Sequence, residues 1–157
     1  MTTIESIQST IQGTPRLQDR LDVVDCVGET ETPQLVDLFR GEWWTRERSE
    51  SDIRRMLEHT DLIQAGRARA TGELVGFARV LTDRVFKAFI FDLIVAPGLR
   101  ERGVGRLLLE RILEHPTLAN VHHFELYCLP EMVPYYERWE FKSGLDVQLM
   151  RLDRRTG

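Results

Sequence analysis

The stretch VAPGLRERGVGR, residues 95–106, determines the fold that we expect for this chain of 157 residues. Before it, the apolar run FIFDLIV at 89–95 is dense in β-branched and aromatic residues, which is typical of a buried strand. After it, residues 104–113 place leucine and isoleucine at helical spacing between charged residues, as an amphipathic helix does. A strand is therefore expected to run through a glycine-bearing turn directly into a helix.

Such a turn suits the binding of an anion. The first backbone N–H groups of a helix have no partner within it, and the helix dipole leaves that end partly positive. Gly103 and Gly105 carry no Cβ, so a phosphate group can approach the backbone closely. Neither G-x-x-x-x-G-K-[ST] nor G-x-G-x-x-G occurs here, which excludes a P-loop and a dinucleotide-binding fingerprint.

The pattern Arg100-x-x-Gly103-x-Gly105, preceded by Val95-x-Pro97, resembles the coenzyme A pyrophosphate loop of the GNAT superfamily of N-acetyltransferases. That loop reads [QR]-x-x-G-x-[GA] after a strand ending in V-x-P. Downstream, PYYERWEF at 134–141 is similar to the family's F-Y-E-K-x-G-F segment, although a glutamate, residue 140, stands where that segment has the glycine of a left-handed helix cap. The resemblance covers residues 22–145.

The resemblance implies an N-acetyltransferase that moves an acetyl group from acetyl-CoA to a primary amine by direct attack in a ternary complex. Tyr136 takes the place of the tyrosine that serves as general acid for the leaving thiolate. A packed aromatic residue is its alternative role, and Tyr135 is the neighbour better suited to packing. The residues implied to bind acetyl-CoA, with an oxyanion-stabilising N–H at the end of the strand, are Leu93, Ile94, Val95, Arg100, Glu101, Arg102, Gly103, Val104, Gly105 and Arg106.

No general base is assigned. Some relatives carry a carboxylate or histidine at the position of Phe89 or Phe91, and this sequence has neither there. Asp92 lies one residue further, so strand alternation points it to the other face, where hydrogen bonds to neighbouring backbone would hold it. Glu125 on the next strand is the other candidate for a buried carboxylate, and a chain of water molecules could equally remove the proton.

Arginines and tryptophans surround the expected site. Arg100, Arg102 and Arg106 either contact phosphate oxygens, which guanidinium groups pair with well, or lie on a solvated helix face. Trp43 and Trp44 lie between two expected helices, where the family forms part of its acceptor pocket. We expect at least one of these tryptophans to pack in the core, while the other could line the pocket.

The order of elements predicts a single α/β domain with a mixed central sheet and helices on both faces, and the resemblance makes that sheet mostly antiparallel. A polar arm at residues 1–20 is expected to precede the domain at 21–157. The expected strands are 21–27, 61–68, 74–81, 87–95, 121–129 and 146–152. The expected helices are 32–40, 49–59, 104–113 and 131–140.

Composition narrows the function classes. The net charge of −4 argues against a sequence-independent nucleic-acid binder, and no apolar stretch approaches the ~20 residues that span a bilayer. Neither the adjacent pair His122 and His123 nor the isolated Cys26 and Cys128 suggests a metal site or disulfide. We expect a cytoplasmic protein, able to pair as a homodimer, with a small-molecule or protein amine as its partner.

Two further classes stay open. One is a catalytically inactive acyl-CoA-binding or sensor module on the same fold, because a fold does not determine a function. The other is an interaction domain that binds no coenzyme A, and the intact Arg100-x-x-Gly103-x-Gly105 turn argues against it.

Overall fold

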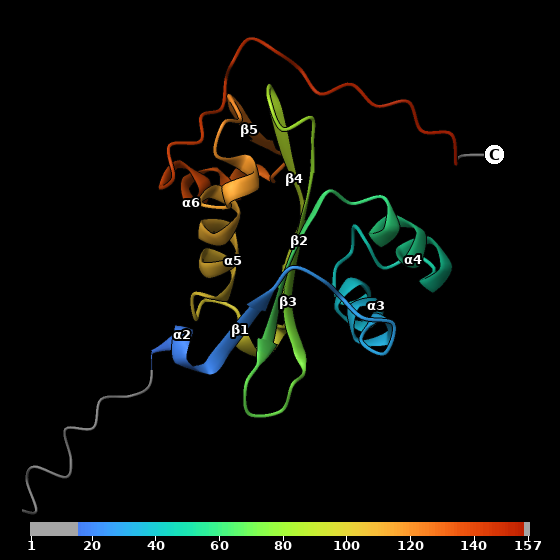
Figure 1. Ribbon diagram of the computed structural model, residues 1–157. Coiled ribbons are helices and arrows are strands. Elements are labelled where there is room, and N and C mark those ends of the chain that lie inside the picture. Colours follow the sequence, from blue (N-terminus) through green and yellow to red (C-terminus); the bar gives the residue numbers. More distant parts are fainter. Residues whose placement is uncertain (1–15, 156–157) are drawn as a thin grey trace, which may run out of the picture.

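The computed structural model describes residues 16–155 and contains one five-stranded mixed sheet (Figure 1). Neighbouring strands follow the chain in the order β1-β2-β3-β4-β5, with three antiparallel pairings and a parallel one between β4 and β5. The mostly antiparallel sheet is thereby confirmed. The strands are β1 Leu21–Val24, β2 Leu62–Ala68, β3 Leu74–Thr82, β4 Lys87–Val95 and β5 His123–Leu126.

Helices cover both faces of this sheet, as expected (Figure 1). Helices α3 and α4 lie on one side, and α5 lies on the other beside the short α6. No helix among residues 16–155 has the length and apolar character needed to cross a membrane. The α-helices are α2 Leu17–Arg20, α3 Thr32–Arg40, α4 Glu50–Glu58, α5 Val104–Leu113 and α6 Val133–Glu137; the short 3-10 turns are η1 Pro97–Leu99, η2 Pro116–Leu118 and η3 Pro130–Met132.

Strand alternation divides the core into two layers. On β3, Phe77 packs against α3, where its ring meets Phe39 edge-on at 5.7 Å between centroids. The next residue, Ala78, faces the opposite layer with Leu109 and Ile112 of α5. Both layers are fully buried, which explains why the sheet sequences are almost continuously apolar.

A β-bulge interrupts β4 at Asp92, and it reverses the direction of the following side chains. Arg79 pairs with Phe91 and Phe77 pairs with Ile94, so one residue of β3 lies opposite two of β4. Asp92 has φ 55°, in the left-handed region. The strand therefore points Ile90 toward α5 but Ile94 toward α3.

Several expected boundaries are corrected. Strands β1 and β5 are shorter than 21–27 and 121–129, and α6 is shorter than 131–140 because η3 precedes it. By contrast, the expected helix 32–40 coincides with α3, whose N-cap is Glu31. Of the expected arm, residues 1–15 lie outside the described residues and Leu17–Arg20 forms α2.

The expected last strand at 146–152 does not form. The segment has no regular structure and leaves its large side chains in solvent, with Val147 79% exposed and Leu152 80% exposed. Figure 1 shows it arching away from the sheet after α6. Alternating apolar residues predict a strand only where a neighbouring strand accepts their hydrogen bonds, and none of the described strands pairs with this segment.

The turn after α6 keeps the geometry of the glycine that Glu140 replaces. Glu140 has φ 64°, and its exposed side chain forms no hydrogen bond within the described residues. A residue with a Cβ pays about 1–2 kcal/mol in the left-handed region. Glycine avoids this cost but loses more backbone entropy on folding, which costs roughly 0.5–1 kcal/mol. The turn is therefore formed despite the substitution, at some cost in stability.

We expect Glu140→Gly to raise the free energy of unfolding by about 0.5–1 kcal/mol, because it removes the Cβ from a left-handed residue. Urea denaturation measures the change. Glu140→Ala is the matched control, since it removes the same carboxylate but keeps the Cβ. Equal stabilities of the glycine and alanine variants would show that the backbone at this position is not strained.

Candidate active site

The loop between β4 and α5 forms a cradle, defined here as residues 101–106. Gly103 caps α5 with φ 89°, a conformation that glycine adopts without strain, and Glu101 is also left-handed at φ 60°. A Cβ built on Gly103 would lie 3.4 Å from Leu17 Cδ2, so conformation rather than crowding is what calls for glycine here. The predicted strand–turn–helix arrangement is present.

Six consecutive N–H groups in the cradle are available to a ligand. The backbone N–H groups from Glu101 to Arg106 donate to no acceptor within residues 16–155, whereas the Leu107 N–H already bonds the Gly103 carbonyl oxygen at 3.0 Å. They surround the N-terminus of α5, where the helix dipole favours negative charge. This arrangement suits a pyrophosphate group.

Helix α6 closes one side of the cradle. A Cβ on Gly105 would lie 3.4 Å from the Tyr135 hydroxyl oxygen and 3.6 Å from Val95 Cγ2, so little free space remains there. The Tyr135 ring also contacts Trp139 at 5.0 Å between centroids. Burial raises the pKa of Tyr135, which keeps its hydroxyl protonated at neutral pH.

The three arginines that frame the cradle have different surroundings. Arg100 donates to Glu42 Oε1 at 2.6 Å, so it links the cradle to the α3–α4 connection rather than pointing freely at an anion. Arg106 is paired along its own helix with Glu110 at 2.7 Å. Exposed Arg102 has no hydrogen-bond partner among the described residues and is free to meet a phosphate.

Strands β4 and β5 part next to the cradle. Their pairing ends at Ile90 and Leu126, whereas β4 continues to Val95. On that side, residues 93–95 have no strand beside them within the described chain. Leu93, Ile94 and Val95 therefore border a notch in the sheet that leads from the cradle toward the opposite face.

Tyr136 lies on α6. Its ring packs in the layer beneath α5, with Phe141 at 6.1 Å and Tyr135 at 5.1 Å between centroids. Burial raises its pKa to about 12, with the neighbouring Tyr135 and Cys128 adding smaller upward contributions. Both tyrosines are thus packed, and packing is the alternative role that the sequence left open for Tyr136. The role of Tyr136 as general acid stays a prediction.

Asp92 is held by two arginines and not by neighbouring backbone, which corrects the sequence-based expectation. Arg48 reaches both carboxylate oxygens, at 2.8 and 3.0 Å, and Arg79 Nε donates to Oδ2 at 2.6 Å. Arg79 also lies over the ring of Phe91, 4.7 Å from its centre. Because of the bulge, Phe91 and Asp92 share a face, and alternation does not separate them.

The expectation that Glu125 is a buried carboxylate is also corrected. Its side chain is half-exposed and paired with Lys87 on β4, so it is not a buried base. Both oxygens of Asp92 accept from guanidinium groups. Neither carboxylate is therefore free to take a proton from an amine.

Neither tryptophan of the α3–α4 connection packs in the core. Trp43 is 62% exposed and Trp44 is 42% exposed, contrary to the expectation for at least one of them. The connection is anchored instead by Thr45, whose buried hydroxyl donates to the Phe39 carbonyl oxygen at 2.7 Å. No sequence pattern marks a single hydrogen-bonding threonine such as Thr45, so it was not identified from the sequence. The ion-pairing residues Glu42, Arg48 and Arg79 were not identified either.

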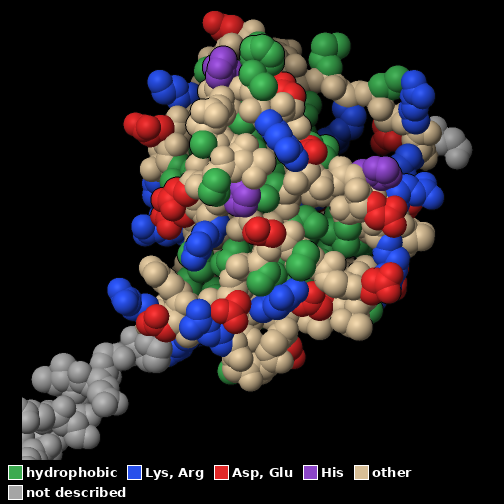
Figure 2. Space-filling model, viewed as in Figure 1, with side chains coloured by type: hydrophobic (Ala, Val, Ile, Leu, Met, Phe, Trp, Pro, Cys, Tyr) green, Lys and Arg blue, Asp and Glu red, His purple; other side chains and the backbone are tan. Residues whose placement is uncertain are grey.

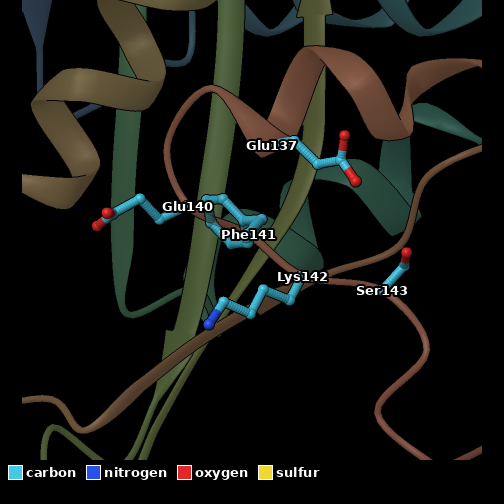
Figure 3. A pocket seen from close by; sticks show the side chains of 5 residues that line it. All are labelled: Glu137, Glu140, Phe141, Lys142 and Ser143. Carbon is cyan, nitrogen blue, oxygen red and sulfur yellow. The ribbon is translucent and has the colours of Figure 1, made fainter.

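Two surface hollows lie near α6, and neither contains the notch. Figure 3 shows the larger one, of about 420 Å³, where Glu137 and Glu140 lie on opposite sides of Phe141. The smaller one, of about 280 Å³, lies beside the cradle between Arg106 and Arg138. Figure 2 shows acidic and basic side chains intermixed over one face of the molecule, with no large area of a single sign.

The raised pKa of Tyr136 predicts a loss of stability in alkali. Its ordinary pKa is about 10 and its folded-state pKa is about 12, so stability is full below pH ~10 and falls as the pH rises through ~12, by about 2 kcal/mol at that point. We expect Tyr136→Phe to lose less stability than the wild type over this interval in urea denaturation. The exposed Tyr127→Phe is the control and should behave as wild type; equal slopes for all three would contradict the buried phenol.

Comparison with known proteins identifies the family. The model of the Acetyltransferase (GNAT) family matches residues 31–141. Serotonin N-acetyltransferase 2, chloroplastic, of Oryza sativa subsp. japonica is 33% identical over 102 residues, which are 64% of this chain and 51% of that protein. GCN5-related N-acetyltransferase 1, chloroplastic, of Arabidopsis thaliana is 31% identical over 113 residues, 72% of this chain and 57% of that protein. The matched regions span about half the length of these curated relatives.

Solved structures share the fold. A Deinococcus radiodurans R1 protein classed as an acetyltransferase superposes with a TM-score of 0.72 at 27% identity, covering 90% of this chain and 94% of its own. An acetyltransferase of Trypanosoma brucei has a TM-score of 0.70 at 21% identity, covering 85% and 99%, and shows the fold alone. Since the family model spans the α3–α4 connection, the cradle and α6, the chain belongs to the GNAT acetyltransferase family.

Proposed function

We propose that this chain transfers an acetyl group from acetyl-CoA to a primary amine, by direct attack of the amine within a ternary complex. The observation that carries the proposal is the row of six N–H groups at the cradle that have no acceptor among the described residues, immediately after residues 93–95, beside which no described strand pairs on the β5 side. The family membership supports acyl transfer. The rice relative is named for serotonin, a primary amine, which supports this class of acceptor.

The cradle fits the pyrophosphate of acetyl-CoA. Gly103 adopts the left-handed turn without strain, and the N–H groups together with Arg102 supply donors and positive charge. In the proposed complex, the pantetheine arm follows the free edge of β4 at 93–95. Such a path brings the thioester into the notch, next to Tyr136 on one side and the Asp92 bulge on the other.

The proposed reaction needs three proton movements. An alkylamine with a pKa of ~10.4 is only about one part in a thousand neutral at pH 7, so its proton is lost before attack. The neutral nitrogen bonds to the thioester carbon, and the carbonyl electrons form an oxyanion that a backbone N–H at 93–95 stabilises. The C–S bond then breaks and the thiolate takes the proton of Tyr136, while the extra proton on the amide nitrogen passes through water and restores the phenol.

In the proposed reaction, water takes the amine proton. Asp92 and Glu125 are both engaged in ion pairs, and each would have to abandon its partner to act as a base. Water entering through the open side of the notch needs no such rearrangement. The rate is therefore expected to follow the neutral fraction of the amine.

An inactive acyl-CoA-binding module is the second candidate. It is favoured by one observation, the raised pKa of Tyr136, because a phenol that holds its proton more firmly is a weaker acid. Such a module would bind acetyl-CoA through the same cradle but would release no free thiol with any amine. Binding and turnover therefore have to be measured separately.

We expect acetyl-CoA to bind in the micromolar range by calorimetry, and Gly103→Glu to weaken binding by about a hundredfold because a carboxylate would face the pyrophosphate. Gly103→Ala is the matched control, since it introduces the same left-handed Cβ without the charge and should lose less affinity. No binding by the wild type would overturn the proposed function.

Tyr136→Phe should retain acetyl-CoA binding and lower turnover with serotonin at least tenfold, about the smallest effect of losing a general acid. Release of free thiol measures turnover. Phe141→Leu serves as a comparison, because it disturbs the packing of the Tyr136 ring without removing a hydroxyl. A phenylalanine variant at 136 with normal turnover would show that another group protonates the thiolate.

A further inference from the structure

One guanidinium on the α3–α4 face of the sheet is incompletely paired. Arg79 uses Nε for Asp92, but neither of its Nη atoms donates a hydrogen bond within residues 16–155. Its side chain is 12% exposed, and no buried side-chain nitrogen among the described residues lacks a partner, so both Nη atoms can be reached from solvent. A partly buried guanidinium with free donors favours an anion, with which it forms strong charge-assisted hydrogen bonds.

Three aromatic rings lie in a row next to this guanidinium. Arg79 lies over Phe91, whose ring centroid is 4.5 Å from that of Phe89, and Phe89 is 4.5 Å from Tyr127. Phe89 and Phe91 are half-buried and Tyr127 is exposed. We call these four residues the arginine–aromatic surface. It offers an anion site at one end and an apolar platform at the other.

The charges around this surface leave an excess of one positive charge. Arg48 and Arg79 share the single carboxylate of Asp92. Glu125 points to the same face, since its neighbours Phe124 and Leu126 pack into the layer beneath α5, but Lys87 already neutralises it. The surface therefore attracts a carboxylate and repels an additional cation.

The surface also lies at the notch. Pairing of β4 with β5 ends at Ile90 and Leu126, and Phe91 and Tyr127 are the next residues on each side. In the function proposed above, on which this inference rests, the thioester lies in the same notch. An acceptor placed on the surface would hold its amine beside the thioester.

We propose that the acceptor is an aromatic α-amino acid: its carboxylate binds the Nη atoms of Arg79 and its ring lies against Phe89, Phe91 and Tyr127. An arylalkylamine without a carboxylate would leave the guanidinium unpaired. A lysine side chain in a protein likewise lacks the neighbouring carboxylate. The anion thus selects the acceptor, and the aromatic rings orient it.

Serotonin and 5-hydroxytryptophan test this directly, because they differ only by the α-carboxylate. With the full chain and acetyl-CoA, we expect kcat/KM for 5-hydroxytryptophan to exceed that for serotonin by about tenfold or more. Rates are compared per neutral amine, since the carboxylate changes the pKa of the amine. This comparison uses the wild type and needs no variant to fold.

In Arg79→Met the ratio of the two kcat/KM values should fall toward one, while Arg79→Lys should keep part of it. Arg67→Met is the matched control: Arg67 is a partly buried arginine of β2 that pairs with Glu31 away from the notch, and its loss should leave the ratio unchanged. Circular dichroism checks that each variant is folded.

The possible outcomes distinguish a failure of the amino-acid acceptor from a failure of the proposed acetyl transfer. A wild-type ratio of one or less, with serotonin acetylated, overturns the amino-acid acceptor and leaves acetyl transfer standing. Acetyl-CoA binding without acetylation of either amine also overturns the acceptor. Absence of acetyl-CoA binding overturns both proposals.

Discussion

The reversal of side-chain direction at Asp92 is the constraint on which the site depends. One extra residue in β4, held at φ 55°, turns Ile94 toward α3 although Ile90 faces α5. The same bulge brings the Asp92 carboxylate onto the face of Phe91, where two arginines meet it. Parallel pairing with β5 ends immediately before this point. A regular strand would bury Asp92 beneath α5, with no arginine to pair it and no edge open beside the cradle.

Two ion pairs of unequal strength hold the α3–α4 connection to the sheet. At its end, Arg48 binds both oxygens of a carboxylate that is 2% exposed, and losing a partner of a buried charge costs more than losing a surface pair even though Arg79 would still hold Asp92. At its start, Glu42 pairs with half-exposed Arg100, and surface pairs contribute about 0–1 kcal/mol. The first pair therefore fixes the connection, whereas Arg100 can exchange Glu42 for a phosphate at little cost. Arg100 can therefore pair with Glu42 in this structure and still contact a phosphate, as its place in the family motif implies.

The sequence was sufficient where the signal is local. Residues 87–95 and 104–113 form β4 and α5 with the predicted limits, because a continuous apolar run and a helical period each depend only on neighbouring residues. It failed where partners are distant: Arg48 lies 44 residues from Asp92, and no pattern announces the pair or the bulge. The alternation at 146–152 was misleading because a strand also needs a neighbour. Glu140 shows the reverse case, in which the surrounding packing imposes the turn on an unfavourable residue.

Burial of Tyr136 weakens it as an acid in isolation, yet the same burial favours the proposed proton transfer. A phenol with a pKa of about 12 should not protonate a thiolate whose ordinary pKa is about 8.5. Desolvation, however, disfavours every anion in the same environment. Partial burial, with a smaller contribution from Glu131, raises the pKa of the neighbouring Cys128 thiol, although that residue is mostly exposed. A thiolate released into this notch would gain proton affinity for the same reason, and the gap between donor and acceptor would narrow. The low polarity around α6 thus acts on both partners of the transfer, and the acidity of the tyrosine alone does not decide its role.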